Sequence, residues 1–461
     1  MSKASYAAQP IAASYRAGAT LVRIILGFCF ANALTAAAQS TEVYREEAMP
    51  PGFTVQVSEL EGPVFADAQG RTLYIWPLHK LRNGYSGEPA GAPRCYDDVI
   101  TVTAGLMSPY PPGIALPDLE QRLSCTALWP PVYAPESAQS VGKWTLVERS
   151  DGTRQWAYDD QPLYTSVRDR EPGDTYGGTG RKRDGDSPAV RVPARPPALV
   201  PPGFAVATVS TGRLLTTDTN ASVYAFAKDS AAAAACTENC LLDWDPVLAP
   251  VMAQARGEWA LLERSPGLRQ WVYRGSPLYT YKHDPAGWSQ TGSDIPGWTN
   301  VYTQRAPAFP ASFTVQSTLA GQVLADEQGR TIYTYQCGED SAHQLACDHP
   351  LDTQVYRLAM CGAGDPQKCL KHWPYVLAAD NASSSSRAWS VMHIDSASGR
   401  VTAAATEGAL RVWAYRDRPV YTFARDQRPG DVHGGGTGEW RGKRNGLFAF
   451  WLRDDYMKKT L

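Results

Sequence analysis

The stretch RQWVYRGSPLYTYKHD, residues 269–284, carries one Trp and three Tyr on either side of a Gly-Ser-Pro sequence. Two further stretches share its pattern, RQWAYDDQPLYTSVRD from Arg154 and RVWAYRDRPVYTFARD from Arg411. In all three, a Trp is followed two and eight residues later by Tyr, and an Asp lies five residues after the second Tyr. The stretches are therefore copies of one element.

Other landmarks recur upstream of each copy in the same order. The segments PPGFTVQV, PPGFAVAT and PASFTVQS begin at Pro50, Pro201 and Pro310, and a Cys-x-x-x-Trp spacing follows in each unit. Such order predicts three tandem repeats, over residues 50–190, 201–304 and 310–455. Within each repeat, LYIW, VYAF and IYTY resemble the later LYTS, LYTY and VYTF, so the chain also divides into six half-units.

The local sequence predicts strands rather than helices. Short runs rich in Val, Thr, Tyr and Trp are bounded by Gly, Asp, Asn and Pro, as in antiparallel hairpins. Only DSAAAAACTENCLLDW indicates helical turns. We therefore predict an all-β, antiparallel protein of three tandem repeats. Separate small sheets and a propeller-like disc are both compatible with the sequence.

The segments outside the repeats predict an exported chain. Residues 1–38 have basic residues before an apolar stretch and end in a small-x-small pattern, as a signal peptide does. An uncleaved anchor is the alternative, and lipid attachment at Cys29 is disfavoured because the bulky Phe28 precedes it. We expect linkers at 39–49, 191–200 and 305–309, and a tail at 456–461.

Composition excludes some classes of protein. The 461 residues are 43% hydrophobic and 20% charged, with a formal net charge of −2. Such a chain can bury cores, and it lacks the basic excess of a nucleic-acid-binding protein. No segment beyond the leader is long enough to span a bilayer as a helix.

Eight cysteines remain beyond the leader, an even number that predicts disulfides in an exported protein. Alignment of the repeats gives the pairs Cys95–Cys125, Cys236–Cys240 and Cys361–Cys369, and leaves Cys337 with Cys347. A metal site at Cys236 and Cys240 is the alternative, but no His lies near them in the sequence.

The aromatic residues of residues 269–284 have two interpretations. If Gly275 to Pro277 form a three-residue loop, four aromatic side chains share one face of the hairpin: Trp271, Tyr273, Tyr279 and Tyr281. A two-residue loop would instead shift the register by one residue and divide these side chains between the two faces. We interpret this face as core. The alternative is a surface on which sugars or other flat ligands stack, and solvent exposure distinguishes the two.

Two groups of residues are candidates for metal binding. Gly-rich loops after the last strand contain Asp174 and Asp431, which could hold calcium with nearby carbonyl oxygens, although a tight turn is the expected role. His343, His349 and His372 flank the cysteines of the third repeat, where they could form a metal site or simply be solvated.

No catalytic group emerges from the sequence. A Ser-His-Asp or Cys-His arrangement cannot be assembled, no pair of acids stands out, and the Gly-rich loops lack the Gly-Lys-Ser/Thr of a phosphate-binding loop. We therefore expect no enzymatic activity and no cofactor. An Asp that ends a strand usually caps the following turn.

The repeats resemble a bacterial family of secreted repeats, or predicted lipoproteins, with a Tyr-x-(Phe/Trp/Tyr)-x-x-Asp motif. The motif residues are Tyr224, Phe226, Asp229, Tyr279, Tyr281, Asp284, Tyr421, Phe423 and Asp426. The first half-unit departs from the motif, because Tyr74 and Trp76 have no Asp after them, and in the third repeat the acids are displaced to Glu339 and Asp340. The resemblance implies an extracytoplasmic location and no catalytic residues.

We thus expect an exported envelope protein that binds or scaffolds, with an envelope protein or a glycan as its partner and no role for nucleic acid. Two alternatives remain. One is a metal- or redox-linked periplasmic factor that uses the Cys and His residues of the third repeat. The other is carbohydrate binding through exposed aromatic residues.

Overall fold

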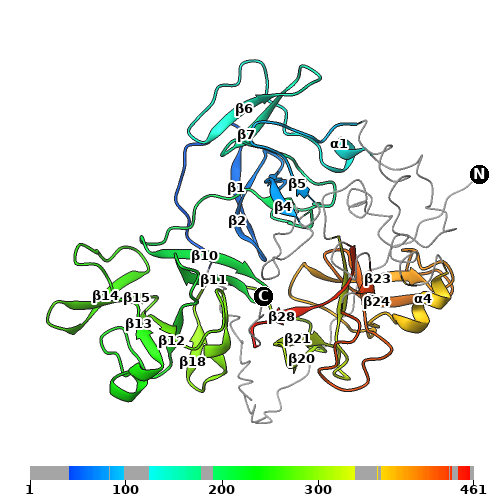
Figure 1. Ribbon diagram of the computed structural model, residues 1–461. Helices are drawn as coiled ribbons and strands as arrows, with labels where there is room; N and C mark the ends of the chain where they lie inside the picture. Colours follow the sequence, from blue (N-terminus) through cyan, green and yellow to red (C-terminus); the bar gives the residue numbers. More distant parts are fainter. Residues whose placement is uncertain are drawn as a thin grey trace, which may run out of the picture. The chain divides into compact units, whose positions relative to one another are not determined.

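The computed structural model describes residues 41–81, 84–97, 124–177, 191–337, 361, 365–435, 437–438 and 445–456. They belong to one compact unit, Gln39–Leu461. Short strands form small antiparallel sheets, and the helices have only a few residues each (Figure 1). The predicted all-β class is confirmed. The expected signal peptide lies outside the described residues.

The middle repeat shows the plan of the repeat most completely. Its first sheet has the order β10 (Phe204–Val209), β11 (Gly212–Thr217) and β19 (Tyr302–Arg305). Its second sheet has the order β13 (Trp244–Pro246), β17 (Tyr279–Tyr281), β12 (Tyr224–Phe226) and β18 (Trp298–Asn300). A third sheet joins β14 (Trp259–Ser265), β15 (Leu268–Tyr273) and β16 (Ser276–Pro277).

The outer repeats follow the same plan. The first repeat contains β1 (Thr54–Ser58), β2 (Gly62–Ala66), β3 (Tyr74–Ile75), β6 (Trp144–Glu148), β7 (Arg154–Tyr158), β8 (Gln161–Pro162) and β9 (Val192–Pro193). The third contains β20 (Thr314–Ser317), β21 (Gln322–Ala325), β22 (Tyr333–Cys337), β23 (Trp389–Asp395), β24 (Ala409–Tyr415), β25 (Arg418–Tyr421), β26 (Thr437–Gly438), β27 (Asn445–Ala449) and β28 (Trp451–Arg453). In each repeat, the chain after the Gly-rich loop returns to complete the sheets of its own repeat.

Few elements fall outside this plan. The first repeat has an inserted hairpin, β4 (His79–Leu81) and β5 (Gly84–Ser86). Short helices precede the Trp of the Cys-x-x-x-Trp spacing: α1 (Cys125–Leu128), the 3-10 helix η2 (Glu238–Leu242) and α4 (Pro366–His372). A further 3-10 helix, η3 (Thr291–Asp294), lies in the Gly-rich loop of the middle repeat. Within the described ranges, no helix is long and apolar enough to cross a membrane.

The segment 191–200, expected to be a linker, contributes a strand to the first repeat. Strand β9 pairs with β3, where Tyr74 lies opposite Pro193 and Ile75 opposite Val192. Pro193 is tolerated in this strand because proline fits at the edge of a sheet, where its missing N–H is not needed.

The turn between β15 and β16 has two residues, not the three that we predicted. Arg274 and Gly275 have positive φ angles of 46° and 78°, and Tyr273 lies opposite Ser276. Positive φ at both central positions is typical of the type I′ turn, whose twist matches that of a hairpin. The prediction that all four aromatic side chains share one face is therefore wrong.

These aromatic residues divide between two cores of the middle repeat. Trp271 and Tyr273 pack with Phe204 and Trp259 on one side. Tyr279 and Tyr281 pass to the second sheet, where they pack with Trp244, Tyr224 and Trp298. Trp271 and Tyr273 are each 4% exposed, Tyr279 is fully buried and Tyr281 is half-buried. Burial supports the interpretation of these side chains as core.

Within the described residues, each repeat contains a disulfide at an equivalent position. The disulfides join Cys95 to Cys125, Cys236 to Cys240 and Cys361 to Cys369, the pairs that the repeat alignment predicts. Cys347 lies outside the described residues, as does the side chain of Cys337.

An arginine ties two of these disulfides to the neighbouring hairpin. In the first repeat, Arg149 donates to the Cys95 carbonyl and to Gln155 Oε1, both at 2.7 Å. Arg264 makes the same bonds in the middle repeat, to the Cys236 carbonyl at 2.6 Å and to Gln270 Oε1 at 2.7 Å. The disulfide and the hairpin are therefore held as one unit.

A glycine of each Gly-rich loop lies against a Trp and leaves no room for a side chain. A Cβ atom on Gly177, Gly292 or Gly434 would lie 2.9, 2.7 or 2.5 Å from Cη2 of Trp129, Trp244 or Trp373. The same Trp rings contact Tyr74, Tyr224 and Tyr333 edge to face, with ring centroids 5.2, 5.2 and 5.1 Å apart. Glycine is thus required here by close packing.

We predict that Gly434→Ala destabilises the protein by about 1–3 kcal/mol, because the added methyl group overpacks this contact. Its neighbour provides a matched control, since a Cβ on Gly435 meets no atom closer than 3.6 Å. Gly435→Ala should change stability by less than about 0.5 kcal/mol. Denaturant midpoints measured by tryptophan fluorescence test the difference, and equal midpoints for the two variants would contradict it.

Candidate functional site

The aspartates that end the back halves are buried or half-buried and accept hydrogen bonds from tyrosines of the front halves. Tyr74 donates to Asp169 at 2.7 Å, Tyr224 to Asp284 at 2.8 Å and Tyr333 to Asp426 at 2.5 Å. Each Tyr belongs to the front half of its repeat and each Asp ends the back half. The motif therefore joins the two half-units of a repeat, because the Tyr and the Asp that bond to each other lie in different halves.

The exchange is reciprocal in the first repeat, where Tyr164 of the back half donates to Glu88 of the front half at 2.6 Å. In the middle repeat, burial and the carboxylate of Asp229 raise the pKa of Tyr279 to about 12. Glu88 was missed in the sequence, where the half-unit of Tyr74 lacks an acid at the motif spacing. The inserted hairpin β4–β5 moves this acid further along the chain. Glu339 and Asp340, the candidates in the third repeat, lie outside the described residues.

The motif acids also organise the Gly-rich loops. Asp169 Oδ1 accepts from the backbone N–H groups of Tyr176 and Gly177, at 2.7 and 3.2 Å. Asp426 Oδ1 accepts from the N–H of His433 at 2.8 Å, and Gly434 N–H donates to the Tyr333 hydroxyl at 3.1 Å. Each carboxylate thus fixes the loop that follows it.

Burial shifts the acid–base behaviour of these groups. It raises the pKa of Asp169 to about 7, although hydrogen bonds from Tyr74 and from the loop oppose the shift. The pKa of Asp284 is raised to about 6 for the same reason. Burial and the adjacent carboxylate of Asp169 also raise the pKa of Tyr74 well above its usual value.

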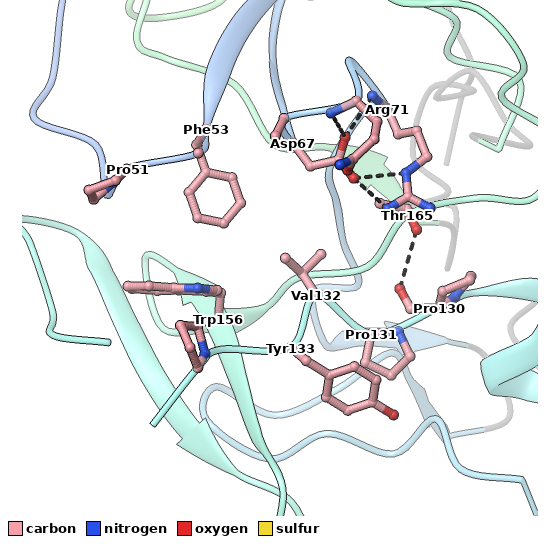
Figure 2. Close-up of a pocket in the computed structure, with 14 residues that line it drawn as sticks. Pro51, Phe53, Asp67, Arg71, Pro130, Pro131, Val132, Tyr133, Trp156 and Thr165 are labelled. Atoms are coloured by element: carbon pink, nitrogen blue, oxygen red, sulfur yellow. Dashed lines mark hydrogen bonds and ion pairs between the residues drawn. The ribbon is translucent and has the colours of Figure 1, made fainter. Parts of the chain in front are cut away.

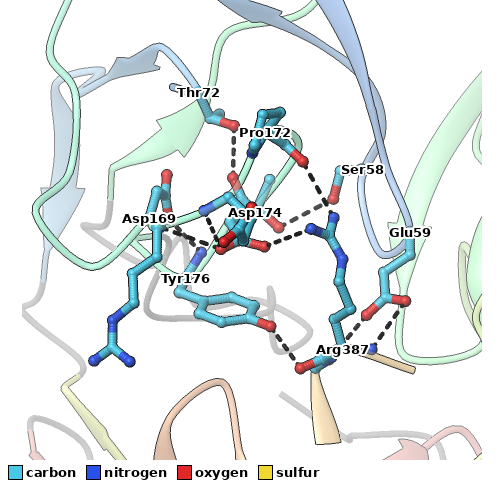
Figure 3. A network of polar contacts seen from close by, with 12 residues as sticks. Ser58, Glu59, Thr72, Asp169, Pro172, Asp174, Tyr176 and Arg387 are labelled. Carbon is cyan, nitrogen blue, oxygen red and sulfur yellow. Dashed lines mark hydrogen bonds and ion pairs between the residues drawn. The ribbon is translucent and has the colours of Figure 1, made fainter. Parts of the chain in front are cut away.

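The calcium candidates Asp174 and Asp431 cap tight turns. Asp174 Oδ2 accepts from the N–H of Glu171 at 2.9 Å, and Asp431 Oδ2 accepts from the N–H of Arg428 at 3.0 Å. Asp174 is further engaged by Arg387 of the third repeat, whose Nη1 lies 3.5 Å from Oδ1 (Figure 3). Their oxygen atoms are therefore used by the chain itself, as a turn requires.

Of the three histidine candidates, the structure describes only His372. His372 is exposed at the end of α4, whereas His343 and His349 lie outside the described ranges. No group of three or more His, Cys, Asp or Glu side chains in those ranges is arranged to hold a metal ion.

The first repeat has an open groove with a cavity volume of about 370 Å³ (Figure 2). Aromatic rings of Phe53, Tyr133 and Trp156 surround it, together with the proline rings of Pro51, Pro130, Pro131 and Pro135. Tyr133 is 54% exposed, whereas Trp156 is 5% exposed and forms part of the core beneath. Sequence analysis did not identify this groove, because its residues come from five separate segments.

The exposed ring of Tyr133 lies near a buried arginine. The guanidinium group of Arg149 lies 6.0 Å from its ring centroid, at the limit of a cation–π interaction, and 4.4 Å from the ring centroid of Tyr96. Arg149 itself is buried and fixed by Gln155 and the Cys95 carbonyl. The residue next to Tyr133 in the chain, Val132, packs against the core instead.

The sister repeats carry different residues at this position. Leu248 and Leu377 occupy the place of Tyr133, and they are 48% and 64% exposed. Each of the three residues is bridged to the central strand of its hairpin, opposite Gln155, Gln270 or Val412. The backbone is thus shared, and only the first repeat offers an aromatic ring.

We predict that stability falls as pH rises from about 4 to about 7, with Asp169 as a main cause. Because its folded-state pKa is about 7, the folded protein keeps a proton that the unfolded chain loses near pH 4. A one-proton difference gives a slope of about 1.4 kcal/mol per pH unit. Denaturant midpoints across this range, compared between wild type and Asp169→Asn, test this; parallel curves would contradict it.

We also predict that Glu88→Ala is strongly destabilising. Glu88 Oε1 accepts from the Tyr164 hydroxyl and from the N–H groups of Arg94 and Cys95, at 2.6, 2.8 and 3.2 Å. A buried donor left unpaired costs about 1–3 kcal/mol. Glu88→Gln keeps an acceptor and should recover most of the loss in thermal unfolding, whereas equal losses in the two variants would argue against a role for these bonds.

Comparison with known proteins identifies two segments of the chain. No curated protein and no solved structure matches it. Residues 145–182 and 401–444 match the family described as a secreted repeat of unknown function. Both segments run through a closing hairpin and its Asp into the Gly-rich loop. These two segments, in the first and third repeats, match the family that the resemblance in sequence predicted.

Proposed function

We propose that this exported repeat protein is a binding module whose ligand site is the groove of the first repeat. The observation that carries the proposal is the exposed ring of Tyr133 in a groove of about 370 Å³. Ligand sites are concave, largely apolar and preformed, with a few polar groups that give orientation. The groove meets these conditions, since Asp67 and Arg71 lie at its rim (Figure 2).

Hydrogen bonds between the first repeat, which carries the groove, and the third repeat support this proposal. Glu59 of the first repeat accepts from Ser386 Oγ at 2.8 Å and from Ala388 N–H at 2.7 Å, both in the third repeat (Figure 3). In the same network, the hydroxyl of Tyr176 donates to the Arg387 carbonyl at 2.6 Å.

The middle repeat is joined to both others. Gln304 Nε2 of the middle repeat donates to the Ser58 carbonyl of the first at 2.8 Å. Glu42, in the segment expected to be a linker, pairs with Arg213 through two bonds of 2.9 Å. Arg453 of the third repeat donates to the Gln290 carbonyl at 2.5 Å. Buried, paired contacts of this kind hold a site in one geometry and reduce the entropy lost on binding.

We predict that Tyr133→Leu abolishes ligand binding without unfolding the protein, because the sister repeats carry Leu at this position. Wild type and variant would be tested by biolayer interferometry on immobilised envelope glycan fragments and peptide arrays. Wild type should retain at least one ligand class, and the variant should bind it at least tenfold more weakly. Leu377→Ala, in the third repeat, is the matched control and should leave binding unchanged. Retention of no ligand, or equal binding by the variant, would reject the proposal.

A further inference from the structure

The walls of the groove offer mainly rings and few hydrogen-bond donors. Proline contributes four of its lining residues, and proline has no backbone N–H. Of its polar groups, the Thr165 hydroxyl is already directed to the Pro130 carbonyl at 3.5 Å. The exposed amide of Gln69 lies beside the turn of Asp67 and Arg71, so a ligand covered with hydroxyl groups would find replacements for its bonds to water there but not over the rings.

The carboxylate at the rim is also occupied. Asp67 accepts from the N–H groups of Gln69 and Arg71, both at 3.0 Å, and from Arg71 Nε at 2.8 Å. The side chain of Arg71 remains 50% exposed, although Nη2 contacts Asp67 at 2.7 Å. The charged group that this rim can still offer to a ligand is therefore a cation.

We infer that the groove binds an extended proline-rich peptide with a carboxylate that reaches Arg71. A polyproline II helix has no internal hydrogen bonds and keeps its backbone solvated, so it needs few partners from the walls. Its prolyl rings pack on aromatic and proline rings, which here are those of Phe53, Tyr133 and the four prolines that line the groove. The carboxylate complements the exposed guanidinium of Arg71. This inference rests on the function proposed above.

Glycans are the main competing ligand class, and the groove fits them less well. Stacking on Tyr133 would suit a sugar face. However, sugar hydroxyls need several convergent donors and acceptors, and the carboxylate of Asp67 is already engaged by its own turn. The peptide is therefore the occupant that this combination of rings and one exposed cation favours.

The test uses the full chain and two synthetic peptides, five prolines followed by glutamate and five prolines followed by glutamine, both blocked at their ends. Isothermal titration should give saturable binding of the glutamate peptide and several-fold weaker binding of the glutamine peptide. Tyr133→Leu should weaken both at least tenfold. Arg71→Gln should weaken only the glutamate peptide, and this effect should shrink as salt rises.

Arg330→Gln is the matched control for the arginine. Arg330 makes the same bonds to Asp326 in the third repeat, at 2.9 Å from its N–H and from Nε, so it reports any cost of breaking this turn. It should leave peptide binding unchanged. If a glycan binds in a manner sensitive to Tyr133→Leu and the peptides do not bind, this inference fails while the proposed function stands. If neither class binds, both fail.

Discussion

The buried hydrogen bond between a tyrosine of one half-unit and a carboxylate of the other is the constraint on which each repeat depends. Tyr224 and Tyr279 lie opposite each other on neighbouring antiparallel strands. Tyr224 donates to Asp284, and in the first repeat Tyr74 donates to Asp169 while Tyr164 donates to Glu88. Because a buried hydroxyl or carboxylate without a partner is costly, the two half-units can pair in only one register. Two short, similar sequences thereby form one defined core.

Other features of the repeat follow from this exchange. The buried carboxylate of the back half also accepts hydrogen bonds from N–H groups of the Gly-rich loop, as Asp169 does from Tyr176 and Gly177. The loop then lies across the Trp of the Cys-x-x-x-Trp spacing so closely that only glycine fits. Between the disulfide and the hairpin, Arg149 and Arg264 supply the link in two repeats. Charged and aromatic residues that recur in the sequence are thus mostly used for packing.

Sequence reasoning recovered the parts of this fold that are local. The repeats, the strands and the three described disulfides follow from spacing and alignment, since each depends on residues near one another or on equivalent positions. The hairpin register did not follow, because a turn of two or three residues is decided by the φ angles of Arg274 and Gly275. Glu88 was missed because an inserted hairpin moved it away from the motif spacing. The groove was missed because its rings are brought together only by folding.

The residues that recur in all three repeats do not identify the proposed binding site, because they belong to the core. The aromatic residues that recur in all three repeats, such as Trp271, are buried, so their repetition records the core. At an exposed position, the residue can differ between repeats without disturbing the core. The position of Tyr133 is exposed in every repeat but carries an aromatic residue only in the first. Under it, the guanidinium of Arg149 is already fixed by the disulfide and the hairpin. A single exposed substitution on a shared backbone is therefore enough to turn one repeat of a structural array into a candidate binding site.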